Sequence, residues 1–185
     1  MKVIIVSGKS GSGKDTFAKL MKADLENQGQ KVMVIHYGDL VKYFAHEYFG
    51  YEQKDRLGRS VLQTVGTNIV RAQDPDYWAE CVARFIAAVS DYFDYCFIPD
   101  ARFPNEIKVT KKYNKDCITV RIHRLNADGT NYVNPEMTEA QLNHESENSL
   151  NTFWFDYVIY NSAGLDKLLR NGRIILENEV QNANT

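Results

Sequence analysis

The fold is decided by residues 3–20, which read VIIVSGKSGSGKDTFAKL. The stretch begins with β-branched apolar residues, turns through glycine and serine, and continues with apolar residues at helical spacing. It therefore predicts a buried strand, a tight loop and a helix. Residues 8–14 match the frame G-x-x-x-x-G-K in this setting, where backbone N–H groups and a helix N-terminus bind phosphate oxygens. A nucleotide-phosphate site is favoured over an ordinary glycine turn.

Each residue of this phosphate loop has an expected role. Lys14 brings a full positive charge to the β- and γ-phosphates, and we count it among the catalytic residues. Contacts with the donor nucleotide are predicted for Gly8, Ser10, Gly11, Ser12, Gly13, Lys14, Asp15 and Thr16.

The residue after the lysine is unusual, because Asp15 stands where the common pattern has the hydroxyl that binds Mg²⁺. The hydroxyl follows one position later, on Thr16, as is typical of adenylate-kinase-like nucleotide kinases. This shift favours a small-molecule kinase over a GTPase or a motor. Two roles are open for Asp15: a charge at a helix N-terminus, stabilising by about 0.3–1 kcal/mol, or a group that orients water on Mg²⁺. Thr16 is the predicted metal ligand.

Composition and charge exclude several classes of protein. The 185 residues fit one domain, 1–185, and a hydrophobic fraction of 44% is sufficient for a core. The net charge of -2 gives no reason to expect binding to polymeric nucleic acid or a membrane surface. We expect no signal peptide and no spanning helix, because apolar runs are short. The expected location is the cytoplasm.

The three cysteines, Cys81, Cys96 and Cys117, are far apart and odd in number. Their spacing indicates neither a disulfide framework nor a structural zinc site. Two of them lie in strand-like apolar runs, where buried, inert thiols are expected. A reducing compartment fits this usage best.

The rest of the chain alternates between strand and helix patterns. Strands are predicted at residues 2–7, 31–37, 95–100, 117–124 and 155–161. Helices are predicted from residue 14 or 15 to about 29, and at 38–50, 58–73, 74–93, 105–113 and 164–179, with Asp39 and Asp74 as N-caps and Pro75 in a first turn. Such alternation predicts an α/β fold with a parallel sheet covered on both faces. The polar, irregular segment at 125–150 is predicted to be a lid.

Five motifs follow one another along the chain: GKDT at 13–16, RSVLQTVGTNIVR at 59–71, DPDYW at 74–78, PDARFPNEI at 99–107 and HESE at 144–147. In this order they resemble the motifs of bacteriophage-type deoxynucleoside monophosphate kinases, over roughly residues 3–150. The resemblance implies a three-layer P-loop kinase fold with strand order 2-3-1-4-5 and an acceptor-binding helical segment at about 38–78. It also implies ATP and Mg²⁺, and the host cytoplasm if a phage encodes the chain.

By the same resemblance, residues 59–71 line the pocket for the acceptor nucleotide. Gln63 would read a base edge and share a helix face with Thr67, and Arg59 or Arg71 would bind the monophosphate. The alternative is a solvated helix face, with Arg71 paired to a nearby carboxylate of 74–78. The predicted substrate-binding residues are Asp39, Lys42, Arg59, Gln63, Thr67, Arg71, Trp78 and Arg102. For Trp78, stacking on a base and anchoring the core are both open.

Asp100 and Arg102 come at the end of a predicted buried strand. Ligands of an open parallel sheet lie outside the carboxyl ends of its strands, so both should converge with the phosphate loop and Asp39. Arg102 is suited to grip a substrate phosphate through two N–H groups. Asp100 would hold Mg²⁺ through water or orient Arg102, and both are counted as catalytic. The alternative is a local salt bridge, with residues 104–106 merely starting the next helix.

Two further groups border the lid. Arg124, at the end of the strand 117–124, is the predicted catalytic lid arginine, because phosphoryl transfer needs positioning and charge neutralisation. The HESE motif at 144–147 has no mechanistic role that the sequence indicates, and a structural hydrogen bond is expected of His144.

The expected reaction transfers the γ-phosphoryl group of ATP to a (deoxy)nucleoside monophosphate. It needs no strong base, because the acceptor is already anionic. One alternative is a kinase of a non-nucleotide metabolite, of the dephospho-coenzyme A or phosphomevalonate type, with Asp39 or Asp100 as base. Another is a nucleotide-binding module without activity. A homodimer is expected from the apolar and aromatic residues of 77–97.

Overall fold

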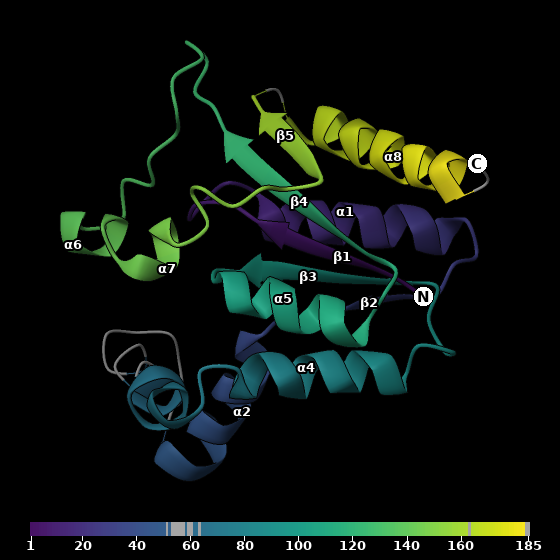
Figure 1. Ribbon diagram of the computed structural model, residues 1–185. Helices are drawn as coiled ribbons and strands as arrows, with labels where there is room; N and C mark the ends of the chain where they lie inside the picture. Colours follow the sequence, from purple (N-terminus) through teal and green to yellow (C-terminus); the bar gives the residue numbers. More distant parts are fainter. Residues whose placement is uncertain (51, 53–57, 59–60, 63, 163, 184–185) are drawn as a thin grey trace.

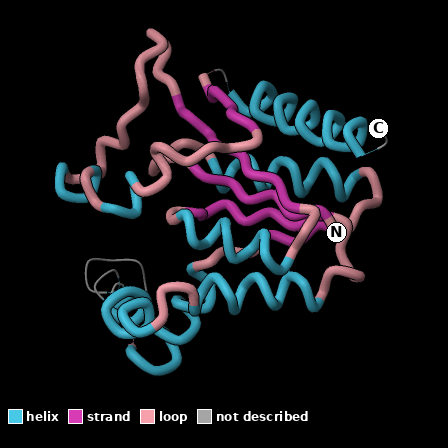
Figure 2. Tube along the Cα trace, in the orientation of Figure 1, coloured by secondary structure: helices cyan, strands magenta, loops and turns pink. Residues whose placement is uncertain are grey.

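The apolar residues of the opening stretch form the central strand of a parallel sheet (Figures 1 and 2). The structure is a computed structural model that describes residues 1–50, 52, 58, 61–62, 64–162 and 164–183. Its strands are β1 (Lys2–Ser7), β2 (Val32–Val34), β3 (Tyr95–Ala101), β4 (Cys117–Arg124) and β5 (Tyr157–Asn161). All pairs are parallel, in the order β2-β3-β1-β4-β5. The predicted sheet is confirmed.

Helices cover both faces of the sheet. Figure 1 shows α1 (Lys14–Asn27) and α8 (Gly164–Ala183) on one face, and α4 (Tyr77–Ala88) and α5 (Pro104–Tyr113) on the other. Successive side chains of a strand point to opposite faces. Accordingly, Ile4 of β1 packs in the α1/α8 core and Ile5 in the α4/α5 core. The three-layer α/β fold is therefore confirmed.

The carboxyl ends of three neighbouring strands are tied together by one hydroxyl. Ser7, at the end of β1, donates its Oγ–H to the carbonyl oxygen of Ala101 in β3, at 3.0 Å. The same Oγ accepts from a guanidinium nitrogen of Arg121 in β4, at 2.9 Å. This buried contact fixes the edge of the sheet from which the phosphate loop departs.

The strand predicted at 31–37 is shorter in the structure, where β2 ends at Val34. Beyond Val34, side-chain carboxylates accept hydrogen bonds from the backbone N–H groups of His36 and Tyr37. Asp39 accepts from the N–H of His36 at 2.9 Å, and Asp100 accepts from that of Tyr37 at 2.9 Å. The predicted N-cap role of Asp39 was wrong, because helix α2 (Gly38–Phe49) already includes it and Tyr37 is the N-cap.

Two other predicted helices differ in detail. Residues Thr64–Arg71, within the segment predicted to be helical at 58–73, are helical as expected and form a π-helix, η1. The carbonyl oxygen of Gly66 in η1 accepts from the indole N–H of Trp78 at 3.1 Å. The helix expected from Asp74 begins at Tyr77, because Asp74 accepts from the N–H of Asp76 and forms a turn.

The segment 125–150 leaves the sheet after β4 and returns to β5, on the left in Figure 1. It contains two one-turn helices, α6 (Glu139–Leu142) and α7 (Glu145–Asn148). Its role as a lid, and the role of residues 38–78 in acceptor binding, stay predictions.

Of the three free cysteines, Cys96 is buried, and Cys81 and Cys117 are half-buried. Burial raises the pKa of Cys96 and of Cys117 to about 12. Most apolar residues of α4, such as Val82 and Ile86, pack inside the chain, so the homodimer stays a prediction. None of the described helices combines the length and apolarity needed to cross a membrane.

Candidate active site

The phosphate loop joins β1 to α1 through left-handed glycines. Gly11 has a φ of 75° and Gly13, the N-cap of α1, a φ of 99°. A Cβ on Gly11 would lie 2.9 Å from the ring of Tyr132, and one on Gly13 would lie 2.9 Å from Nδ2 of Asn161. Only glycine fits both the backbone angles and the space at these two positions. They let the backbone of residues 8–14 curl into a cradle that exposes its amide groups.

Lys14 lies inside this cradle with 6% of its surface exposed. Its Nζ donates to the carbonyl oxygens of Gly8 at 2.8 Å and of Lys9 at 3.0 Å. Burial, and secondly the charge of Arg102, lower its pKa to about 8. A bound phosphate would favour the charged ammonium again, so the site is prepared for an anion.

The residues present fit a nucleotide with its metal ion. Among the side chains that the structure describes, Ser12 Oγ is the one buried nitrogen or oxygen without a hydrogen-bond partner, and it lies in the cradle. Thr16 is exposed in the first turn of α1. The described residues contain no cluster of His, Cys, Asp and Glu that could hold a metal alone.

Asp15 has a partner that the sequence did not indicate. Its Oδ1 contacts Nε2 of His36 at 3.0 Å, and Nδ1 of the same ring lies 3.2 Å from Oδ2 of Asp39. The bond with Asp15, and then that with Asp39, raise the pKa of His36 to about 10. The His36 bond lowers the pKa of Asp15. The imidazolium thus links the start of α1 to the start of α2.

We expect His36→Gln to lower the melting temperature at pH 7. The folded pKa of about 10 exceeds the ordinary 6.5, so the charged ring contributes stability that is full below pH 6.5 and lost as pH rises toward about 10. Solvent screens part of it, because 65% of the Asp15 side chain is exposed. Thermal unfolding from pH 6 to 10 tests this, with His46→Gln, an exposed ring on α2, as control. A difference that persists at pH 10 would contradict it.

Asp100 and Arg102 lie at the carboxyl end of β3, as expected. Both oxygens of Asp100 accept backbone N–H groups at the start of α2, from Tyr37 at 2.9 Å and Gly38 at 3.1 Å. Burial raises the pKa of Asp100. Its metal role stays a prediction. The expected alternative, a salt bridge between Asp100 and Arg102, is not what the structure has, because Arg102 pairs with Glu147.

A cavity of 290 Å³ lies between α2, η1 and the end of β3. The predicted substrate-binding residues among its lining are Lys42, Thr67, Arg71, Trp78 and Arg102. Trp78 is 6% exposed and its indole N–H is bonded to Gly66, so it anchors the wall of this cavity. Arg59 and Gln63 lie outside the described residues.

Arg71 is held in this cavity by groups other than the acids expected. Its guanidinium carbon lies 4.1 Å from the centre of the Phe103 ring, and Nη1 is 3.6 Å from Oε1 of Glu106. Burial raises the pKa of Glu106 to about 7. Glu106 also accepts the backbone N–H groups of Arg102 at 2.7 Å and Phe103 at 3.0 Å. A glutamate in the first turn of α5 is the sequence signal that could have indicated this capping role.

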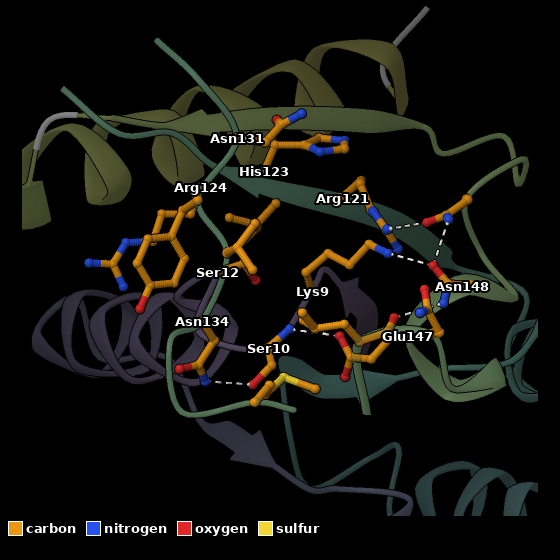
Figure 3. Close-up of a pocket in the computed structure, with 17 residues that line it drawn as sticks. Lys9, Ser10, Ser12, Arg121, His123, Arg124, Asn131, Asn134, Glu147 and Asn148 are labelled. Atoms are coloured by element: carbon orange, nitrogen blue, oxygen red, sulfur yellow. Dashed lines mark hydrogen bonds between the residues drawn. The ribbon is translucent and has the colours of Figure 1, made fainter. Parts of the chain in front are cut away.

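A second cavity, of 430 Å³, lies between the phosphate loop, the end of β4 and the segment 125–150 (Figure 3). Arg124 Nη1 donates to the carbonyl oxygen of Gly11 at 3.0 Å, and its guanidinium lies 3.9 Å from the centre of the Tyr132 ring. Asn134 donates to Ser10 Oγ at 3.1 Å. The segment therefore contacts the loop through Asn134, and the catalytic role predicted for Arg124 stays a prediction.

Comparison with known families finds two matches in the chain. Residues 51–171 match the model of the deoxynucleotide monophosphate kinases. Residues 1–74 match the model of the adenylylsulphate kinases. A comparison with curated protein sequences found no match.

Solved structures of several kinases are similar in fold. An adenylylsulphate (APS) kinase of Mycobacterium tuberculosis, solved with AMPPNP and APS, gives a TM-score of 0.54 at 14% identity, over 95% of this chain and 97% of the other. A gluconokinase of Sinorhizobium meliloti gives 0.56 at 13%, over 98% and 95%. A sugar kinase of a Janibacter species gives 0.52 at 14%, over 96% and 95%. At such identities the likeness is one of fold.

Proposed function

This chain belongs to the deoxynucleotide monophosphate kinase family, and on that premise we propose that it phosphorylates a (deoxy)nucleoside monophosphate with ATP. One observation carries the proposal. Arg102 lines the 290 Å³ cavity and also pairs with Glu147, whose other oxygen accepts from the backbone N–H of Ser10 in the phosphate loop. The guanidinium of Arg102 therefore lies between this cavity, which we assign to the acceptor, and the phosphate loop, which we assign to the donor.

The residues divide the work of phosphoryl transfer between the two substrates. The loop amides and Lys14 bind the donor phosphates, and Arg102 with Arg71 binds the acceptor phosphate. Arg124 reaches over the loop and neutralises charge that develops on the transferred group. Thr16, and Asp100 through water, would hold Mg²⁺ together with the ATP phosphates, where the ion would neutralise further charge.

The rival reaction, phosphorylation of a hydroxyl, requires a carboxylate base. Both expected bases are occupied in other ways. The carboxylate of Asp39 accepts from the backbone N–H of His36 and from Lys42 Nζ, the latter at 3.0 Å. Burial raises the pKa of this carboxyl group, but the bonds with His36 outweigh it and hold the pKa below the ordinary range. Asp100 accepts two backbone N–H groups. An anionic acceptor, which needs no base, fits these carboxylates better.

The test is a coupled ADP-release assay with Mg-ATP. The acceptors are the four deoxynucleoside monophosphates, UMP, dephospho-coenzyme A and phosphomevalonate. We expect turnover with one or more nucleotides, and the pattern names the base. Turnover with a non-nucleotide alone would overturn the proposal. So would a loss of all turnover in Asp39→Asn with unchanged acceptor binding, because that result identifies a base.

A further inference from the structure

The HESE motif at 144–147 enters the site through its last residue. His144 is the N-cap of α7, and its Nδ1 accepts from the backbone N–H of Ser146 at 3.2 Å. This cap starts the one-turn helix that carries Glu147. The motif therefore forms a one-turn helix, α7, that positions the carboxylate of Glu147.

Glu147 bridges the two halves of the site. Its side chain is 6% exposed. One carboxylate oxygen, Oε2, accepts from the backbone N–H of Ser10 in the phosphate loop at 2.9 Å, as Figure 3 shows. The other, Oε1, forms an ion pair with Nη1 of Arg102. A buried carboxylate with both oxygens satisfied is held in one place.

A second contact links helix α7 to the phosphate loop. Lys9 Nζ donates to Oδ1 of Asn148, the residue after Glu147, at 2.7 Å. Asn151 donates to the same oxygen at 3.1 Å, and its own Oδ1 accepts from Arg121 at 3.4 Å (Figure 3). The position of Glu147 is thus set by the loop and by β4, not by α7 alone.

The charges around Glu147 explain why an anion is needed there. Lys9, Lys14, Arg102 and Arg121 all gather at this end of the sheet. Burial lowers the pKa of Lys14, the charge of Arg102 lowers it further, and Glu147 raises it. The pKa of Arg121 is lowered by burial and by Arg102 and raised by Glu147. Without the carboxylate, repulsion would drive the guanidinium of Arg102 away from the other cations.

We propose that Glu147 is a positioning residue that holds the guanidinium of Arg102 between the phosphate loop and the acceptor cavity. The proposal rests on the proposed function, since Arg102 acts there on the acceptor phosphate. The ion pair uses Nη1, and within the described part of the chain the other side-chain N–H groups of Arg102 form no hydrogen bond, so they could bind phosphate. Glu147 belongs to the segment 125–150. Closure of that segment would therefore also orient the guanidinium of Arg102 toward the acceptor.

The test replaces Glu147 by glutamine, which keeps the shape but removes the charge. We expect a fall of about 100-fold in kcat, the size that a misplaced group causes. The melting temperature should also fall, because the partly buried guanidinium of Arg102 loses its ion-pair partner, and the Kd of Mg-AMPPNP should change less than kcat. Glu145→Gln, the same change on an exposed residue of α7, is the control and should keep full activity. In an Arg102→Ala background, Glu147→Gln should cost nothing more, because its effect passes through Arg102.

An additive loss in that double variant would overturn the proposal, as it would show a role independent of Arg102. Tighter Mg-AMPPNP binding with faster turnover in Glu147→Gln would also overturn it, by identifying Glu147 as a competitor of the phosphates. A second readout does not need turnover. In protein with ¹⁵N-labelled arginine, the guanidinium signal that Arg102→Lys removes should shift in Glu147→Gln and not in Glu145→Gln.

The two proposals fail in different ways. If the wild-type chain phosphorylates none of the nucleoside monophosphates, the proposed function fails. The guanidinium signal of Arg102 then tests by itself whether Glu147 positions Arg102. A signal that Glu147→Gln does not shift would overturn the positioning role.

Discussion

Replacing Lys14 by alanine is expected to lower kcat/KM for ATP by about 1,000-fold, the scale of losing a main electrostatic contact with a transferring phosphoryl group. Lys14 Nζ lies between the carbonyl oxygens of Gly8 and Lys9, inside the loop. Steady-state kinetics and thermal unfolding measure the effect, and Lys19→Ala, on the exposed face of α1, is the control.

The pH dependence of ATP binding gives this prediction a sharper form. The pKa of Lys14 is lowered to about 8 in the free protein, first by burial and then by Arg102. Phosphates favour the charged form, so above pH 8 binding must take up a proton. The Kd of Mg-AMPPNP should rise by up to about tenfold per pH unit there, and Lys14→Ala should abolish that rise. A Kd that is flat from pH 7 to 9.5 in the wild type would contradict the assignment.

The sheet could be predicted because its signals are local. The strands predicted at 2–7 and 117–124 are rich in β-branched residues, and β1 and β4 have the bounds that were predicted for them. The phosphate loop could be predicted because Gly11 and Gly13 satisfy a backbone need that other residues meet poorly. The strand order was accessible through the family resemblance, not through any pattern in the strands themselves.

The parts that could not be predicted depend on contacts between distant segments. His36 lies 21 residues from its partner Asp15. Glu147 contacts Ser10 and Arg102 across separations of 137 and 45 residues. Such pairs leave no period or spacing in the sequence. The bond between the indole of Trp78 and the carbonyl of Gly66, 12 residues apart, could not be predicted for the same reason.

Arg102→Ala is the second large effect, and it tests where the two substrates meet. We expect kcat/KM for the acceptor to fall by about 1,000-fold, the lower end of what an arginine contributes to phosphoryl transfer. The KM for ATP should change little, because Lys14 and the loop amides bind the donor. The fold should survive, because the capping bond from the backbone N–H of Arg102 to Glu106 does not need the side chain.

The conservative variant separates charge from geometry in this prediction. Arg102→Lys keeps the positive charge but loses the planar fork, so it should restore only part of the activity if two N–H groups grip the acceptor phosphate. Arg170→Ala, on the exposed surface of α8, is the control for loss of an arginine elsewhere. Full activity in Arg102→Lys would mean that charge alone suffices. An unchanged KM for the acceptor in Arg102→Ala would remove Arg102 from the acceptor site, and with it the argument that the cavity beside it receives a monophosphate.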